Sequence, residues 1–95
     1  MAPSEVRLTG RLICGSLQEF EIVRRYLPAH VRLTREGPGC LSFVVMQTED
    51  PLVWQVEERF VDRQAFALHQ NRTRASEWWA KTSGIARDYE ISGLE

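Results

Sequence analysis

The chain has few cysteines, no long apolar run and no excess charge of either sign. Its two cysteines, Cys14 and Cys40, are too few for a disulfide framework, and no third or fourth ligand stands at a spacing typical of zinc sites. No apolar stretch approaches the roughly 18 residues of a membrane span, and residues 1–5 lack the hydrophobic core of a signal peptide. We therefore expect a cytoplasmic protein without a metal site or a membrane partner, with both cysteines as small core residues.

The charge is balanced and the composition is ordinary. The 95 residues carry 12 Lys and Arg against 13 Asp and Glu, for a net charge of -1, and 43% are hydrophobic. This balance is typical of a globular domain and provides no basic surface for nucleic acid. The basic pairs Arg24–Arg25 and Arg72 with Arg74 fall in expected helices, where they indicate a solvated face. With no linker composition and no internal repeat, we expect a single domain over residues 1–95.

The hydrophobic periodicity predicts elements in the order β-α-β-β-α-β. Alternation of apolar and polar residues predicts strands, whereas apolar residues three or four positions apart predict helices. Strands are expected at residues 6–14, 40–48, 53–61 and 85–91. The turn at 49–51 joins the middle two strands into a hairpin.

The first helix has recognisable ends. Ser16 is its expected N-cap, and the glycines of Gly37–Gly39 stop it. Pro28 lies inside the helical pattern, where it removes one hydrogen bond and crowds a carbonyl. We therefore expect a kink or break around residues 24–27.

The second helix is expected to begin after Asp62 as N-cap and to be interrupted at Asn71, with a second piece at 73–82. The complete order corresponds to the α+β, ferredoxin-like fold, in which an antiparallel four-stranded sheet carries both helices on one face. In that topology Cys14 and Cys40 lie at opposite ends of the sheet, too far apart for a disulfide.

Apolar residues occur on both faces of the expected sheet. In the second strand Leu41, Phe43 and Val45 point one way, while Val44 and Met46 point the other. Helices cover only one face, so the other would expose a large apolar patch. We therefore expect a homodimer in which two sheets pack face to face and form a dimeric α/β barrel.

A glycine turn, a strand carboxylate and a helical histidine form the most informative unit of the chain. The turn is Gly37-Pro38-Gly39, Glu58 shares a strand face with apolar neighbours, and His69 follows on the second helix. A carboxylate on an apolar face needs a partner, and an imidazole can accept and return a proton near neutral pH. The arrangement predicts an acid/base pair at the mouth of a pocket, although packing alone is an alternative.

The same residues resemble the antibiotic biosynthesis monooxygenase family. The resemblance lies in the turn at 36–43 with the preceding residues 30–35, and in Glu58 followed by residues 62–69, and it covers nearly the whole chain. It implies a dimeric α/β barrel built from ferredoxin-like protomers. Members include enzymes that oxidise phenolic or quinol-type substrates with O2 and without any cofactor. An aromatic residue often precedes the strand glutamate in that family, whereas Glu57 stands there in this chain.

Such chemistry assigns roles to particular residues. Because O2 reacts poorly with closed-shell molecules, a cofactor-free oxygenase must first take a proton from the substrate hydroxyl. His69 is the candidate base and Glu58 its partner, so these two are the predicted catalytic residues. The predicted substrate-binding residues are aromatic or can contact an anionic oxygen, and they are Trp54, Phe43, Trp78, Trp79, Arg87, Tyr89 and His30. Of the adjacent tryptophans, one is expected to pack between helix and sheet and the other to line a pocket or the dimer interface.

The sequence leaves two classes of function open. In the first, the protein is a monooxygenase or related oxidoreductase that acts on a small aromatic substrate and O2 without a cofactor. In the second, it is a non-catalytic dimeric module that binds a small apolar ligand in the same pocket. An isomerase or decarboxylase would use the same acid/base pair and cannot be separated from the oxygenase by sequence.

Overall fold

The structure is a computed structural model that describes residues 5–94. Its elements follow the predicted order, with the second helical region in two pieces. They are β1 (Val6–Ile13), α1 (Leu17–Glu36), β2 (Cys40–Gln47), β3 (Val53–Phe60), α2 (Arg63–Arg74), α3 (Glu77–Thr82) and β4 (Ala86–Ser92).

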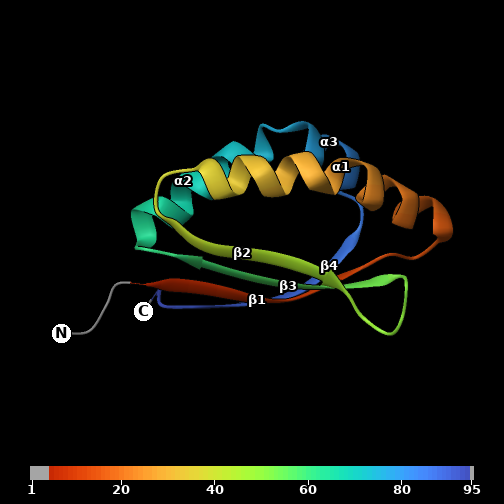
Figure 1. The fold of residues 1–95 in the computed structure, drawn as a ribbon. Helices are drawn as coiled ribbons and strands as arrows, with labels where there is room; N and C mark the ends of the chain where they lie inside the picture. The colour runs from red at the N-terminus through yellow and green to blue at the C-terminus, as the bar shows by residue number, and fades with distance from the viewer. Residues whose placement is uncertain (1–4, 95) are drawn as a thin grey trace.

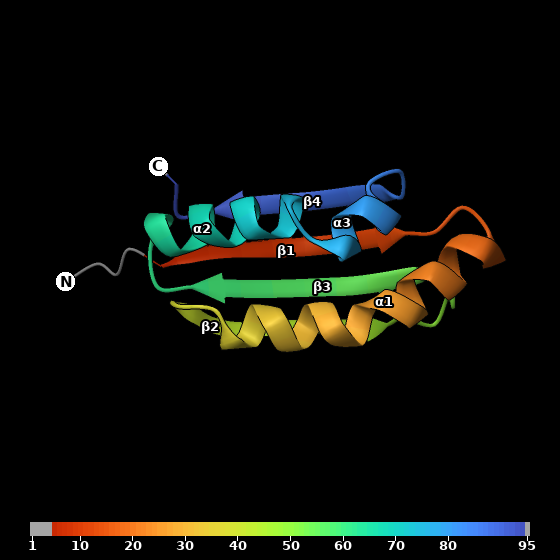
Figure 2. The same cartoon turned by 90° about the horizontal axis from the view of Figure 1, so that it is seen from above.

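The four strands form one antiparallel sheet in the order β2-β3-β1-β4. All three helices lie on the same face of this sheet (Figure 1), with α1 running above β2 and β3 and α2 above β1 and β4 (Figure 2). This arrangement confirms the predicted ferredoxin-like fold. None of the helices within residues 5–94 is long and apolar enough to cross a membrane.

The cysteines lie where the predicted topology puts them. Cys40 pairs with Phe60 at one end of the sheet, whereas Cys14 follows the opposite end of β1 and donates its backbone N–H to Leu52. Both thiols are free, and Cys14 is buried. The prediction that they form no disulfide with each other is therefore confirmed.

Helix α1 begins as predicted, but it is not broken. The Ser16 hydroxyl accepts a hydrogen bond from the backbone N–H of Glu19 at 3.2 Å, and the helix continues through Pro28 to Glu36. Of the two outcomes expected around residues 24–27, a kink or a break, the continuous helix excludes the break. Pro28 is exposed, so water can reach the carbonyl that it leaves without an intrahelical donor.

The second helical region is interrupted at Ala75 and not at Asn71, so this expectation is wrong. Helix α2 begins where the Asp62 carboxylate accepts from the N–H of Ala65 at 2.8 Å. The Ser76 hydroxyl ends it by donating to the Thr73 carbonyl, and the same oxygen accepts from an N–H in the first turn of α3. One serine therefore satisfies both helix ends, which favours a break at this point.

The core lies between the helices and the inner face of the sheet. The inward positions of β3 are Trp54, Val56, Glu58 and Phe60, so a carboxylate occupies one place in an otherwise apolar series. Residues of β1, α1, α2 and α3 pack against this face; the buried ones are Val6, Leu8, Leu12, Val23, Leu27, Phe66 and Trp78.

The outer face of the sheet carries apolar residues among charged ones. Val44 and Met46 point to this face, as predicted, opposite Glu57 and Gln55 of β3, whereas Ile13 and Val53 pair with each other near the hairpin end of the same face. Met46 is 52% exposed. Leu41 departs from the expected alternation because β2 has an irregular register between Cys40 and Ser42, which leaves Leu41 exposed.

Candidate functional site

A cavity of about 180 Å³ lies between the sheet and the helices α2 and α3. Its floor comes from the inward faces of all four strands, and its roof from the helices. The lining residues are Leu8, Leu12, His30, Phe43, Val45, Val56, Glu58, His69, Gln70, Thr73, Arg74, Trp78, Trp79, Arg87 and Tyr89. The cavity therefore contains eight of the nine residues that the sequence identified as site candidates.

Glu58 and His69 converge inside this cavity. Glu58 is 6% exposed, and its Oε1 has no hydrogen-bond partner among the described residues. The nearest cation-forming group is His69 Nε2, at 3.5 Å from that oxygen. This distance is too long for a strong hydrogen bond but short enough for a small side-chain movement to close it. The two side chains therefore face each other inside the cavity without a strong hydrogen bond between them.

The local sequence explains why His69 stands above Glu58. The Asp62 cap starts α2 directly after β3 ends, and Phe66 packs one turn later on Phe60, with ring centroids 5.6 Å apart. His69 comes one turn after Phe66 on the same side of the helix, and its ring lies 4.7 Å from that of Phe60. Aromatic packing on β3 thus fixes the imidazole over the strand that carries the carboxylate.

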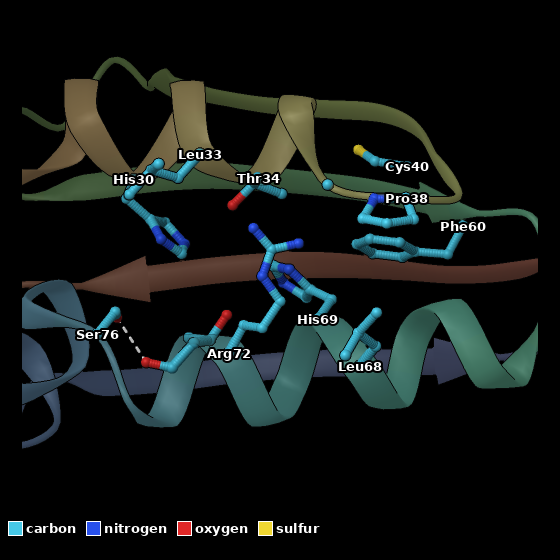
Figure 3. Close-up of a pocket in the computed structure, with 12 residues that line it drawn as sticks. His30, Leu33, Thr34, Pro38, Cys40, Phe60, Leu68, His69, Arg72 and Ser76 are labelled. Carbon is cyan, nitrogen blue, oxygen red and sulfur yellow. Dashed lines mark hydrogen bonds between the residues drawn. The ribbon is translucent and has the colours of Figure 1, made fainter.

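His30 forms the second imidazole of the site. It stacks on Trp78 with centroids 4.8 Å apart and an interplanar angle of 5°, and it meets Phe43 edge to face at 5.4 Å. Burial lowers the pKa of His30 to about 4, and the nearby His69 and Arg87 act in the same direction. His30 is consequently neutral at physiological pH, so its ring offers one N–H donor and one acceptor. Figure 3 shows the rings of His30 and His69 pointing into the space between α1 and α2.

Arg87 is largely committed to structure. Its Nη1 donates to the carbonyl oxygens of Thr82 at 2.8 Å and Ile85 at 3.0 Å, and its Nη2 donates to the Thr82 hydroxyl at 3.0 Å. The guanidinium also lies 5.0 Å from the ring centroid of Trp79. The guanidinium also interacts with the Tyr89 side chain, so little of its donor capacity remains for a ligand.

Tyr89 provides a hydroxyl at the same end of the cavity. Burial raises its pKa to about 12, although the charge of Arg87 opposes this effect. The ring lies over Gly10, where an added Cβ would come within 2.8 Å of Tyr89 Cδ1 and within 2.1 Å of the Asp88 carbonyl oxygen. Gly10 thus admits the tyrosine ring, and the protonated phenol is available as a hydrogen-bond donor at neutral pH.

Two aromatic placements differ from expectation. Trp54 is absent from the cavity lining; it is buried in the core and stacks on Phe20 at 5.9 Å. The prediction that Trp54 forms a pocket wall is therefore corrected. Trp78 and Trp79 both line the cavity, although only one was expected to, because the short helix α3 lies across its mouth and both rings meet it.

Sequence reasoning missed three polar lining residues on α2, namely Gln70, Thr73 and Arg74. Helical spacing could have found them, since Thr73 lies four positions after His69 and Arg74 four after Gln70. The incorrect break at Asn71 separated Thr73 and Arg74 from the histidine, and Gln70 was overlooked beside it.

The described residues provide no metal centre. Across residues 5–94, no group of three His, Cys, Asp or Glu side chains is placed to hold a metal ion.

The fold and the cavity define a ferredoxin-like α+β protein with a buried glutamate facing a histidine. The model of the antibiotic biosynthesis monooxygenase family matches residues 17–81, so the chain belongs to this family. No protein with curated annotation matches the chain.

Solved structures with low sequence identity share the fold. A "putative antibiotic biosynthesis monooxygenase" from Nitrosomonas europaea has a TM-score of 0.83 at 16% identity, covering 98% of this chain and 92% of that one. Rv0793 from Mycobacterium tuberculosis has a TM-score of 0.76 at 20% identity, covering 93% and 92%. MupZ from Pseudomonas fluorescens has a TM-score of 0.79 at 15% identity, covering 96% and 69%.

Proposed function

We propose that the protein is a cofactor-independent monooxygenase that oxidises a small phenolic or quinol-type aromatic compound with O2. The observation that carries this proposal is the buried pair of Glu58 and His69 in an aromatic cavity. Membership in the antibiotic biosynthesis monooxygenase family supports the reaction class.

In this proposal His69 takes the hydroxyl proton of the substrate, and Glu58 orients the imidazole and stabilises its charged form. The resulting electron-rich anion reacts with O2. O2 adds to a ring carbon, and His69 returns its proton to the resulting peroxide. The O–O bond then breaks as that carbon loses its hydrogen, so one oxygen atom stays as a new carbonyl and the other leaves as water. The neutral His30 and the protonated Tyr89 are suitable hydrogen-bond donors to the oxygen anion of the substrate.

The cavity volume limits the substrate. About 180 Å³ is slightly more than the roughly 150 Å³ of an engineered cavity that holds benzene. The enclosed space therefore accommodates one substituted ring, and further rings would extend beyond the mouth. We expect monocyclic hydroquinones to be better substrates than anthrones.

Oxygen uptake tests the proposal. Adding methylhydroquinone to the protein should consume O2, and His69→Ala should reduce the rate by about 10²- to 10⁴-fold, the usual contribution of a general base. Glu49→Gln is the matched control, because Glu49 is exposed in the turn between β2 and β3 and does not line the cavity. Uptake that persists unchanged in His69→Ala would refute the role of the base.

A ligand that raises the melting temperature of the protein without any O2 uptake would instead support the non-catalytic binding module. The cavity would then serve binding alone, and the loose contact between Glu58 and His69 would have no catalytic part.

We also propose that the functional unit is a homodimer formed through the outer face of the sheet. The apolar group of Ile13, Val44, Met46 and Val53 lies on that face, away from the cavity. Packing two such faces would bury these side chains and produce a dimeric barrel with a separate cavity in each protomer.

A further inference from the structure

A second hollow lies in the groove between α1 and α2. It measures about 80 Å³ and is the view of Figure 3. It shares three lining residues, His30, His69 and Thr73, with the cavity over the sheet. The two imidazole rings are 6.2 Å apart between centroids, a separation typical of rings in contact, so they form a partition between the groove and the cavity.

The groove contains positive charge but no acidic residue. Arg72 lines it, whereas Asp and Glu are absent from its lining. Within residues 5–94 the guanidinium of Arg72 makes no hydrogen bond or ion pair, and Figure 3 shows it directed between the helices beside His69. By contrast, Arg59 is paired with Glu5, and Arg35 donates to the Phe43 carbonyl.

The turn after α1 is shaped to admit this guanidinium. Gly37 has φ −72° and ψ 150°, a conformation open to any residue, so its backbone does not require glycine. A Cβ at Gly37 would lie 2.6 Å from Arg72 Nη1. The absence of a side chain at Gly37 therefore leaves space for the guanidinium over the groove.

A hydroxyl completes the set of donors. Thr34 is 7% exposed, its Oγ1 makes no hydrogen bond within the described part of the chain, and Figure 3 shows this oxygen pointing into the groove. Arg72 and Thr34 thus approach the groove from opposite helices, with the imidazole of His69 below them. A planar anion with two acceptor oxygens can accept hydrogen bonds from two N–H groups of a guanidinium and from a neighbouring hydroxyl.

We propose that this groove binds a carboxylate, with Arg72 as its cation and Thr34 as a further donor. A volume of about 80 Å³ is roughly half that of a cavity that holds benzene, so the groove takes an acidic group with one or two carbons and excludes a ring. The site is distinct from the contact between Glu58 and His69, and the assignment does not depend on turnover in the cavity.

Nuclear magnetic resonance of the 11.0 kDa chain tests this assignment. Acetate should shift the Arg72 Nε–Hε signal and the His69 ring signals, whereas the neutral, equally sized acetamide should not. Arg72→Gln should weaken acetate binding, followed at His69, by about tenfold. Arg32→Gln, an exposed α1 position outside both hollows, is the control and should leave binding unchanged.

A second variant keeps the arginine. Gly37→Ala places a methyl group against the guanidinium and should also weaken acetate binding. The assignment is overturned if acetate and acetamide cause equal shifts, or if Arg72→Gln binds acetate as tightly as the unaltered protein.

The carboxylate can belong to a free acid or to the ligand in the cavity. Displacement of acetate by 2,5-dihydroxyphenylacetate, but not by methylhydroquinone, would show that one aromatic acid occupies both spaces. Acetate that stays bound beside both aromatic compounds would identify a separate small acid. Either result retains the groove as a carboxylate site. Neither measurement requires O2 uptake, so a failure of the oxygenase proposal can be distinguished from a failure of the carboxylate site.

Discussion

Replacing Glu58 with methionine should stabilise the protein. The carboxylate is 6% exposed, and its Oε1 has no hydrogen-bond partner within residues 5–94. Among the same described residues, the one ionisable group within 4 Å of this oxygen is His69 Nε2, at 3.5 Å. Methionine is unbranched and of similar length, so it can follow the path of the glutamate between Leu8 and Phe43, the residues that pair with position 58.

The expected size follows from the cost of this burial. A buried polar group without a partner costs roughly 1–3 kcal/mol, and replacing buried ionic groups by apolar ones of similar volume often stabilises proteins by about 1–4 kcal/mol. Loss of the carboxylate breaks no strong hydrogen bond, because the contact with His69 Nε2 is 3.5 Å long. We expect the free energy of unfolding to rise by about 1–2 kcal/mol, which corresponds to an increase in Tm of roughly 5–12 °C for a domain of this size.

Urea and thermal unfolding at pH 7 provide the measurement. Glu49→Gln is the control, since its side chain is exposed in the turn between β2 and β3, and it should change stability by less than about 0.5 kcal/mol. If Glu58→Met instead destabilises the protein by more than about 1 kcal/mol, Glu58 is a structural residue and the reasoning from its missing partner is refuted.

The other predictions concern pH, packing and assembly. His30 has a folded pKa of about 4, below the ordinary value near 6.5, so the stability it contributes is present above pH 6.5 and is lost as the pH falls toward 4. His30→Phe can keep the stack on Trp78, and its free energy of unfolding, measured with urea at each pH, should fall less steeply with decreasing pH. Equal pH dependence in the two proteins would contradict this assignment. Gly10→Ala should lower the free energy of unfolding by about 2–3 kcal/mol, because the new Cβ would lie 2.1 Å from the Asp88 carbonyl oxygen; a neutral result would show that β1 and β4 can separate at that point. Met46→Lys should convert the proposed dimer to a monomer in light scattering, whereas an unchanged mass would exclude the outer face as the interface.

The fold could be predicted from the sequence because its signals are local and repeated. Alternation along β3 and the caps at Ser16 and Asp62 each specify one element, and their order leaves few topologies. The errors came where tertiary context decides. Pro28 is tolerated because it faces solvent. Helix α2 ends where it does because the Ser76 hydroxyl makes hydrogen bonds to both helix ends, and the helix propensity of Asn71 gives no information about those bonds.

The site was predictable only as far as strand and helix faces determine it. Glu58 stood out because it interrupts an apolar strand face, and the Asp62 cap fixes where His69 falls above it. Which aromatic rings meet the cavity depends on three-dimensional packing. Trp54 lies on the same strand face as Glu58, yet its stack with Phe20 places it in the core away from the cavity.

The position of Glu58 argues that the cavity is under functional constraint. One inward place of β3 holds a carboxylate among Trp54, Val56 and Phe60, although an apolar residue there would pack better. Natural proteins retain such destabilising groups chiefly where activity depends on them. Stability and function should therefore move in opposite directions at this position: Glu58→Met should unfold at higher temperature and yet lose O2 uptake. A variant that gained stability and kept full uptake would show that the base works alone, and the proposed role of Glu58 would have to be abandoned.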